Sequence, residues 1–295
     1  MMVYSRSDKI VKTLANLVMI VLSAGALLPF VVLFMASISD NDLIVRLGYT
    51  IWPRGFSLEA YAYIFDNISV IGRAYLITVF VTIVGTFVSL LVTNTAAYAL
   101  SHDRMPLRRV LMFYIVFTML FNGGLVPTYY VYSQIVQIRN TLPALIVPNL
   151  LCSAFNVILV RNYYRFSIPS TILDSARIDG AGEFRIFLRI MLPLSLPITA
   201  TVGLLTAIIY WNDWQNGLYY LSGPEYFSIQ QVLRVMSTDL MFLANNSTNT
   251  GVTRNLPLST IRMAIAAIGI IPLLLVFPFF EKYFVKGITI GAVKE

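Results

Sequence analysis

Charged residues divide this sequence into long apolar runs. Six stretches contain no Asp, Glu, Lys or Arg, and each is at least 18 residues long. A helix needs about 20 apolar residues to cross a hydrocarbon core of about 30 Å, and backbone inside a bilayer must satisfy its own hydrogen bonds. We therefore expect six transmembrane helices, at residues 14–37, 75–100, 109–131, 143–163, 193–212 and 261–281.

The composition also indicates an integral membrane protein. Hydrophobic residues make up 58% of the chain and charged residues only 12%, whereas a soluble domain is about half apolar and about a quarter charged. Cys152 is the only cysteine, which excludes an intramolecular disulfide and a cysteine-rich zinc site. The first apolar run is too long for a typical signal peptide, so we expect it to stay in the protein as a span.

The distribution of positive charge predicts the orientation. Of the 21 Lys and Arg residues, 14 fall in the segments that include both termini and 7 fall in the alternate segments. The positive-inside rule then places both termini in the cytoplasm, as an even number of spans requires. This topology also explains the formal net charge of +7. No basic stretch is interleaved with aromatic residues in a nucleic-acid-binding pattern, so we expect no nucleic-acid partner.

The cytoplasmic segment between the fourth and fifth spans, residues 167–192, is longer than a simple connector. Loops between bundle helices usually have about 2–8 residues. Pro169 suits the first turn of a short helix, and Asp179-Gly180 is typical of a turn. A second helix would then carry four apolar side chains at helical spacing, Phe184, Phe187, Leu188 and Met191. We predict a helix–turn–helix at the membrane surface.

This segment resembles a known motif. The motif is the EAA motif of binding-protein-dependent ABC importer permeases, which reads Glu-Ala-Ala, two residues, Asp-Gly-Ala, about eight residues, then Ile-x-Leu-Pro. The matching residues here are Asp174-Ser175-Ala176, Asp179-Gly180-Ala181, Ile190, Leu192 and Pro193. The sequence departs from the motif at Asp174, which keeps the acid, and at Ser175.

Weaker resemblances extend over the rest of the chain. Trp211-Asn212 resembles a signature of sugar permeases, and residues 285–294 resemble the C-terminal tail of the second permease of the maltose importer. Residues 229–234 resemble the subgroup of permeases that handles oligosaccharides derived from polysaccharides. Together with the EAA-like motif, these segments stand in the same order as in the family.

The resemblance implies a fold and a set of partners. It implies an all-α integral membrane protein with the six-helix fold of type I ABC importer permeases, forming one permease domain over residues 1–295 in a bacterial cytoplasmic membrane. In this family the loop helix docks on a cytoplasmic ATPase dimer, while a second, non-identical permease and an extracytoplasmic solute-binding protein complete the importer. The residues expected to couple the chain to the ATPase are Ile172, Leu173, Asp174, Ser175, Ala176, Arg177, Asp179, Gly180 and Ala181.

A separate ATPase is expected because the sequence has no phosphate-binding loop. No Gly-x-x-x-x-Gly-Lys-Ser/Thr run is present. We therefore expect a non-catalytic subunit that binds no cofactor, with ATP and Mg held by the partner. The six runs also lack the ionisable residues that proton- and sodium-coupled carriers usually place near the midplane. An ion-coupled sugar carrier and a membrane scaffold subunit without a transport path stay open as alternatives.

A path for an oligosaccharide needs aromatic rings for the apolar sugar faces and polar groups for the hydroxyls. The candidate side chains are Asn122, Tyr210, Trp211, Asn212 and Trp214. For Asn94 and Asn156 we expect hydrogen bonds between helices instead. Residues 39–73 and 213–260 are exterior segments that either meet the solute-binding protein or are simply solvated. The sugar stays open, and fragments of acidic polysaccharides such as alginate or pectin are among the candidates.

Overall fold

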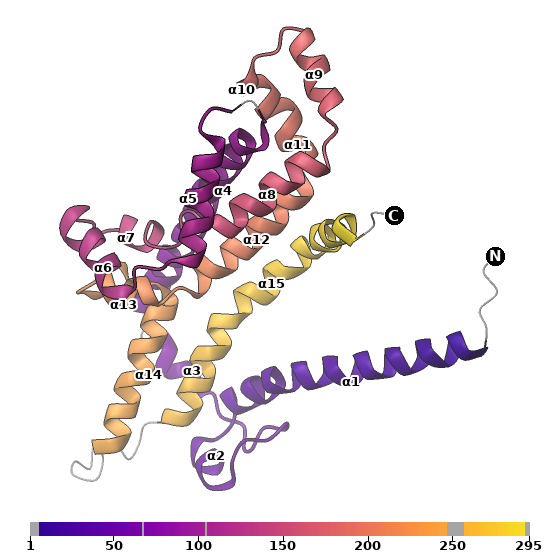
Figure 1. The fold of residues 1–295 in the computed structure, drawn as a ribbon. Coiled ribbons are helices and arrows are strands. Elements are labelled where there is room, and N and C mark those ends of the chain that lie inside the picture. The colour runs from indigo at the N-terminus through magenta and orange to yellow at the C-terminus, as the bar shows by residue number, and fades with distance from the viewer. Residues whose placement is uncertain (1–5, 67, 104, 247–256, 293–295) are drawn as a thin grey trace. The chain divides into compact units, whose positions relative to one another are not determined.

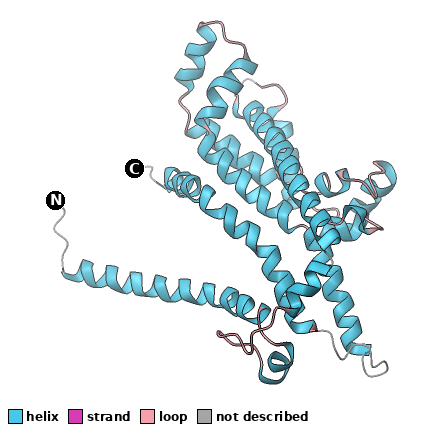
Figure 2. Ribbon diagram, turned by 180° about the vertical axis from the view of Figure 1, so that it is seen from behind, coloured by secondary structure: helices cyan, strands magenta, loops and turns pink. Residues whose placement is uncertain are grey.

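The computed structural model describes residues 6–66, 68–103, 105–246 and 257–292, and these residues form helices joined by loops (Figures 1 and 2). No strand occurs among them, although an isolated β-bridge joins Ser39 to Phe56. The chain divides into two compact units, residues 1–69 with 235–271 and residues 70–234 with 272–295.

The first unit holds the N-terminal helices, α1 (Arg6–Ser37), α2 (Asn41–Leu47) and α3 (Glu59–Asp66). Asp40 caps α2, because its carboxylate accepts a hydrogen bond from the N–H of Leu43 at 3.1 Å. The side chain of Asn41 accepts another from the N–H of Ser259, near the start of α15, at 3.1 Å. In the most apolar window of α1 no residue is buried within the chain, which suits a helix that faces lipid or another subunit.

The second unit holds most of the helices. In chain order they are α4 (Ile68–Ser101), α5 (Arg108–Leu120), α6 (Leu125–Tyr130), α7 (Pro143–Ile146), α8 (Ala154–Phe166), α9 (Ser170–Ile178), α10 (Glu183–Ile186), α11 (Leu192–Leu194), α12 (Leu196–Asn212), α13 (Gln215–Tyr220), α14 (Ile229–Asn246) and α15 (Leu258–Ala292), the last two shared with the first unit. In Figure 1, α9 and α10 lie at one end of the group formed by α4, α5, α8 and α12, and α6, α7 and α13 lie at the other end.

The helices match the predicted spans in part. Three described helices are long and apolar enough to cross a membrane, Ile10–Ser37, Ile68–Ser101 and Ser259–Val276. Two bent pairs also qualify if each pair is one span: Arg108–Leu120 with Leu125–Ile135, bent by 117°, and Glu183–Leu194 with Leu196–Asn212, bent by 79°. The described residues therefore offer three to five candidate spans, and the sixth stays a prediction.

The prediction of one continuous helix over residues 143–163 is wrong. Helix α7 ends at Ile146 and α8 begins only at Ala154. Pro148 lies between them, and because proline has no backbone N–H it cannot donate to the carbonyl four residues earlier and so cannot continue the helical hydrogen bonds. Asn149 follows with a φ of 60°, which ends the helical path. The apolar content of this segment predicted a span but could not show the break.

Polar side chains join three helices of the second unit, α4, α8 and α12. The side-chain oxygen of Asn94 on α4 accepts hydrogen bonds from the Tyr164 hydroxyl of α8 at 2.6 Å and from the Thr199 hydroxyl of α12 at 3.2 Å. Asn156 of α8 donates to the Thr206 hydroxyl of α12 at 3.5 Å. The predicted role of Asn94 and Asn156 in joining helices is confirmed, as expected for amides that cannot face lipid without a penalty.

Helices α4 and α12 also approach closely at a glycine. A Cβ on Gly85 of α4 would lie 2.6 Å from the ring of Tyr210 on α12. The Tyr210 side chain is buried, and its hydroxyl donates a hydrogen bond to the carbonyl of Ile146 at 2.9 Å. Because the ring is held at both ends, only glycine fits at this position of α4.

Candidate functional site

The EAA-like segment forms a short helix that ends in a tight turn. Pro169 occupies the N-cap position directly before α9, so the helix begins one residue later than Pro169. At the other end Gly180 has a φ of 78°, a left-handed conformation that glycine adopts without strain. The N–H of Ala181 returns a hydrogen bond to the carbonyl of Ala176 at 2.9 Å. The predicted helix and the Asp179-Gly180 turn are confirmed.

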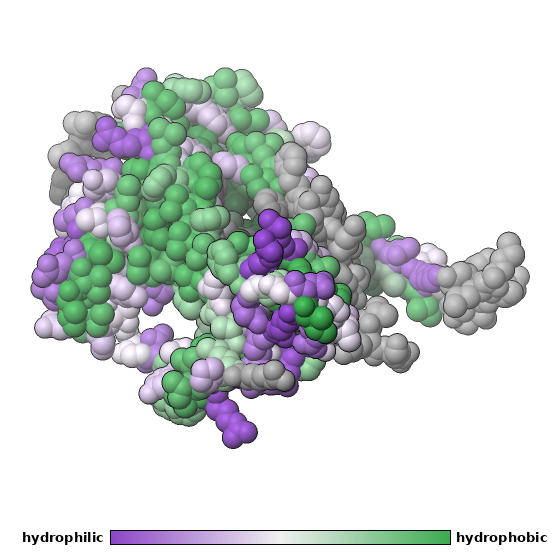
Figure 3. All heavy atoms as spheres, turned by 90° about the horizontal axis from the view of Figure 1, so that it is seen from above, coloured by the Kyte–Doolittle hydropathy of each residue, from purple (hydrophilic) through white to green (hydrophobic). Residues whose placement is uncertain are grey.

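The two faces of α9 have different surroundings. Leu173, Ala176 and Ala181 pack against the core cluster of the second unit. That cluster comprises Ala97, Val160, Tyr164, Ile168, Ile186, Phe187, Met191, Ile198 and Val202. Ile172 and Ile178 point outward and are 41% and 86% exposed. The view from above shows hydrophobic residues exposed beside hydrophilic ones (Figure 3). Helix α9 is thus anchored through Leu173 and Ala176, while Ile172 and Ile178 stay exposed.

A chain of polar contacts ties α9 to the end of α4. Arg177 contacts the carboxylate of Asp174 at 3.0 Å through Nη1 and that of Glu183 at 2.9 Å through Nε. The Tyr98 hydroxyl of α4 donates to the second oxygen of Glu183 at 2.5 Å, and His102 Nε2 lies 3.7 Å from the same oxygen. We call these five residues the α9–α4 clasp.

The electrostatics of the clasp follow from these contacts. Hydrogen bonds from Arg177 and then from Tyr98 hold the pKa of the Glu183 carboxyl below its ordinary value. The bond to Glu183 likewise raises the pKa of Arg177. The Glu183 and Arg177 side chains remain 57% and 35% exposed, so water screens the pair and its contribution to stability is small.

Sequence reasoning missed part of this clasp. Asp174 and Arg177 are spaced i, i+3 on one helix, a spacing at which side chains of opposite charge meet, so their pair could have been found. The Tyr98–Glu183 contact joins residues 85 positions apart, and no local pattern signals it. Asp179 and Ser175 are exposed, with no ion pair for Asp179 among the described residues.

The second helix of the predicted helix–turn–helix differs from the expectation. It is split into α10, a π-helical turn at Phe187–Met191, and α11. Since a π turn holds one more residue than an α turn, the expected apolar stripe does not stay on one face. Phe187 and Met191 are buried, whereas Phe184 is 76% and Leu188 44% exposed. The single predicted face over these four residues is wrong.

The candidate sugar-path residues at the end of α12 lie in unlike surroundings. Tyr210 is buried with its hydroxyl already bonded, as described above. Asn212 donates to the carbonyl of Ile208 at 2.9 Å, and its oxygen lies 3.4 Å from the side-chain nitrogen of Gln230. Trp214 lies beneath the guanidinium of Arg234, 5.0 Å from the ring centroid. Asn122 stands apart from them in the chain, at the break between α5 and α6, where it accepts from the N–H of Gly124 at 2.9 Å.

Trp211 borders an apolar cavity rather than a polar one. The cavity has a volume of about 520 Å³ and is lined by α4, α12 and α15. Its polar groups include the hydroxyls of Thr82 and Thr86, which are buried and have no hydrogen-bond partner in the described structure. A sugar would present several hydroxyls to a lining that could satisfy few of them. The cavity therefore suits hydrocarbon better than carbohydrate.

The chain is similar over nearly its whole length to curated transport proteins. It is 39% identical over 267 residues to the polygalacturonan/rhamnogalacturonan transport system permease protein YtcP of Bacillus subtilis, which covers 90% of this chain and 92% of that protein. It is 28% identical over 273 residues to the arabinooligosaccharides transport system permease protein AraQ of Halalkalibacterium halodurans, 91% of each chain. A comparison with models of protein families finds no match.

The fold is also similar to that of a solved transporter structure. It is the crystal structure of a bacterial ABC transporter involved in the import of the acidic polysaccharide alginate. The similarity covers 96% of this chain and 100% of the matched chain, with a TM-score of 0.81 and 31% sequence identity. Sequence and structure thus agree over almost all of the chain.

Proposed function

The chain belongs to the family of carbohydrate ABC importer permeases, and we propose that helix α9 transmits motion from the importer's ATPase to its membrane helices. As a member of this family it is a multi-pass, non-catalytic subunit of a binding-protein-dependent importer of oligo- or polysaccharides. The EAA-like residues Asp174–Ala181 would dock into the ATPase through the outward face of α9.

The observation that carries this proposal is the double character of α9. Ile172 and Ile178 are exposed where an apolar partner surface could cover them, while Leu173 and Ala176 fix the helix to the core. The clasp adds a second attachment, from Arg177 and Glu183 to Tyr98 on α4. A push on the outer face of α9 would therefore reach α4 as well as α12, which follows the loop in the chain.

The proposed assembly follows the family. We propose that a cytoplasmic ATPase dimer holds ATP and Mg, that a second, non-identical permease completes the path, and that an extracytoplasmic solute-binding protein delivers the sugar. Both termini would be cytoplasmic, in the inner membrane of a bacterium. The excess of Lys and Arg in the terminal segments supports this orientation.

The proposed cargo is an oligosaccharide derived from an acidic polysaccharide. Two similarities support it: the 39% identity to a permease named for polygalacturonan and rhamnogalacturonan, and the 31% identity to a chain of an alginate importer. The described structure adds the Arg234–Trp214 pair at the outer end of α12, an aromatic ring beside a cation, which suits an acidic sugar.

The proposal is tested on the reconstituted complex with its ATPase. Ile178→Asp should weaken ATPase association about 10- to 100-fold, since it removes an apolar side chain from the docking face and adds a charge there. Binding-protein-stimulated ATP hydrolysis and uptake of oligogalacturonate would fall together. Ile178→Val, which keeps an apolar side chain, is the control. Unchanged association and uptake for Ile178→Asp would overturn the coupling role of α9.

A further inference from the structure

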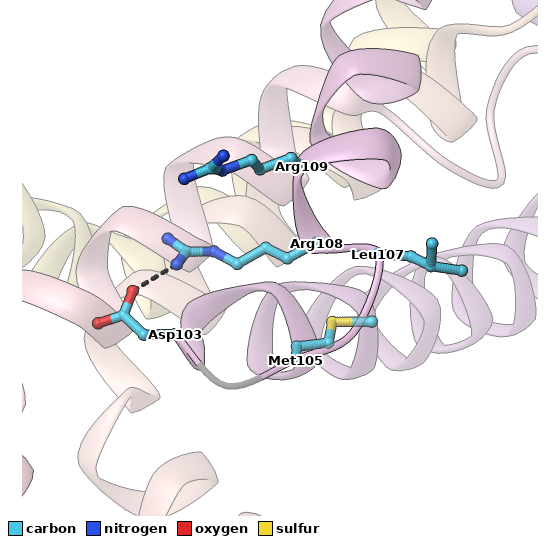
Figure 4. Close-up of a pocket in the computed structure, with 5 residues that line it drawn as sticks. All are labelled: Asp103, Met105, Leu107, Arg108 and Arg109. Carbon is cyan, nitrogen blue, oxygen red and sulfur yellow. Dashed lines mark hydrogen bonds and ion pairs between the residues drawn. The ribbon is translucent and has the colours of Figure 1, made fainter.

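A basic cavity lies where α4 ends and α5 begins (Figure 4). It has a volume of about 550 Å³ and is lined by Asp103, Met105, Leu107, Arg108 and Arg109. In Figure 4 the Arg108 and Arg109 side chains extend to the same side, and Met105 and Leu107 lie away from their guanidinium groups. The volume falls in the range of about 300–1,000 Å³ that is usual for small-molecule sites.

The charges around this cavity do not balance. Asp103 is the one carboxylate among the described residues that line it, and it is paired with Arg108 and, at 3.2 Å, with Arg165 of α8. These guanidinium groups hold the pKa of the Asp103 carboxyl below its ordinary value. Arg109 forms no ion pair within the described part of the chain. Two guanidinium groups therefore share one carboxylate and a third, that of Arg109, lies beside the cavity, which leaves positive charge for an external anion.

An exposed apolar surface continues from the cavity along α5. Leu107 is 72% exposed, and α5, which begins at Arg108, has no buried residue. The rings of Phe113 and Phe117 on this helix and of Phe121 directly after it follow one another, with centroids 5.9 and 4.5 Å apart. A free phosphate would leave this surface uncovered, whereas a molecule with an anionic head and hydrocarbon tails would match both parts.

We propose that this cavity binds the phosphate headgroup of an anionic phospholipid, with its acyl chains lying along α5. Basic pockets between membrane helices bind anionic headgroups on the cytoplasmic side, where the leaflet carries negative charge. The distribution of Lys and Arg predicts that this end of α4 is cytoplasmic. The site lies outside the sugar path and does not depend on the coupling role of α9.

The test uses the full-length chain in its purified complex in detergent. Phosphatidylglycerol, phosphatidylcholine and inorganic phosphate are titrated in parallel, and lipid retention is measured by native mass spectrometry alongside the thermal midpoint. Phosphatidylglycerol should be retained and should raise the midpoint, while the other two should not. Arg109→Gln should weaken phosphatidylglycerol binding about fivefold, and Asp103→Asn, which removes the competing carboxylate, should strengthen it by a similar factor.

Arg189→Gln is the matched control, since Arg189 is an exposed arginine of the turn after α10 and its loss changes the net charge equally. Equal retention of both lipids, or equal weakening by Arg109→Gln and Arg189→Gln, would overturn the site. Displacement of the lipid by millimolar phosphate would overturn the proposal of a lipid ligand and would indicate a soluble anion instead. Release of the ATPase by Arg109→Gln with lipid retention unchanged would assign the cavity to a protein contact instead.

Discussion

The two ends of the second unit are held together by different kinds of contact. At the α9 end, charged side chains form the clasp, and both members of the Arg177–Glu183 pair are partly exposed. At the α13 end, two buried neutral side chains donate hydrogen bonds to backbone carbonyls. Tyr210 donates to the carbonyl of Ile146 at 2.9 Å and Asn216 to that of Pro148 at 3.1 Å.

This difference assigns different mechanical properties to the two ends. Exposed ion pairs contribute about 0–1 kcal/mol each and can break and re-form at little cost. A buried hydrogen bond leaves an unsatisfied group when one partner is lost, at about 1–3 kcal/mol. The ion pairs at the α9 end can therefore adjust, which would suit the proposed coupling to an ATPase, while the buried hydrogen bonds at the α13 end form a fixed base.

The largest expected effect comes from breaking the fixed end. Tyr210→Ala should destabilise the chain by about 3–5 kcal/mol, because it empties a buried site and removes the bond to Ile146. The thermal midpoint of the purified complex measures this loss. Tyr130→Ala is the control, since Tyr130 is 59% exposed. Equal shifts for the two variants would contradict a fixed α13 end.

The same contact can be tested from α4. Gly85→Ala should destabilise by about 1–3 kcal/mol, because the added methyl would meet the Tyr210 ring at 2.6 Å. Gly72→Ala lies in the same helix and meets no atom within 4 Å, so it should be neutral or slightly stabilising. Thermal unfolding of both variants measures the difference. If the Gly85→Ala chain were as stable as the Gly72→Ala chain, the close approach of α4 to Tyr210 would be ruled out.

A smaller change in stability but a clear change in coupling is expected at the adjustable end. Glu183→Gln removes the charge that holds Arg177 and should lower the free energy of unfolding by less than about 1 kcal/mol. If the clasp transmits motion, the amount of sugar imported per ATP hydrolysed should fall several-fold. Glu225→Gln, at an exposed acid after α13, is the control. If the amount of sugar imported per ATP hydrolysed did not change, the clasp would have no part in coupling.

The smallest effect is a pH dependence of opposite sign at the two ends. The lowered pKa of Glu183 contributes stability above the ordinary carboxyl pKa of about 4.3, and this is lost as pH falls through the lowered value. Burial raises the pKa of Asp213 at the α13 end, so falling pH relieves its penalty and adds stability there. Thermal midpoints between pH 7 and pH 3 should therefore drop less with pH in Glu183→Gln than in the parent, and more in Asp213→Asn. Parallel curves would contradict both assignments.

The sequence predicted this molecule best where local chemistry decides the structure. The EAA-like spacing located α9, and the Asp179-Gly180 pair located its turn, because a left-handed residue at a helix end favours glycine. Apolar content predicted α1, α4 and α15 but hid the breaks at Pro148 and between α5 and α6. The Tyr98–Glu183 contact and the burial of Tyr210 depend on helices meeting in space, and neighbouring residues carry no sign of either.

The amide oxygen of Asn94 has a consequence for how α12 can slide. Its two hydrogen bonds, from Tyr164 and Thr199, use both lone pairs. One helical turn before Thr199 stands Ser195, whose hydroxyl lies 3.4 Å from that of Thr199, and one turn after it stands Gly203. A shift of α12 by one turn is about 5.4 Å. In one direction it would bring the Ser195 hydroxyl to Asn94 in place of the Thr199 hydroxyl. In the other direction it would bring Gly203, which has no side-chain donor. The hydrogen bonds of Asn94 therefore favour displacement of α12 in a single direction.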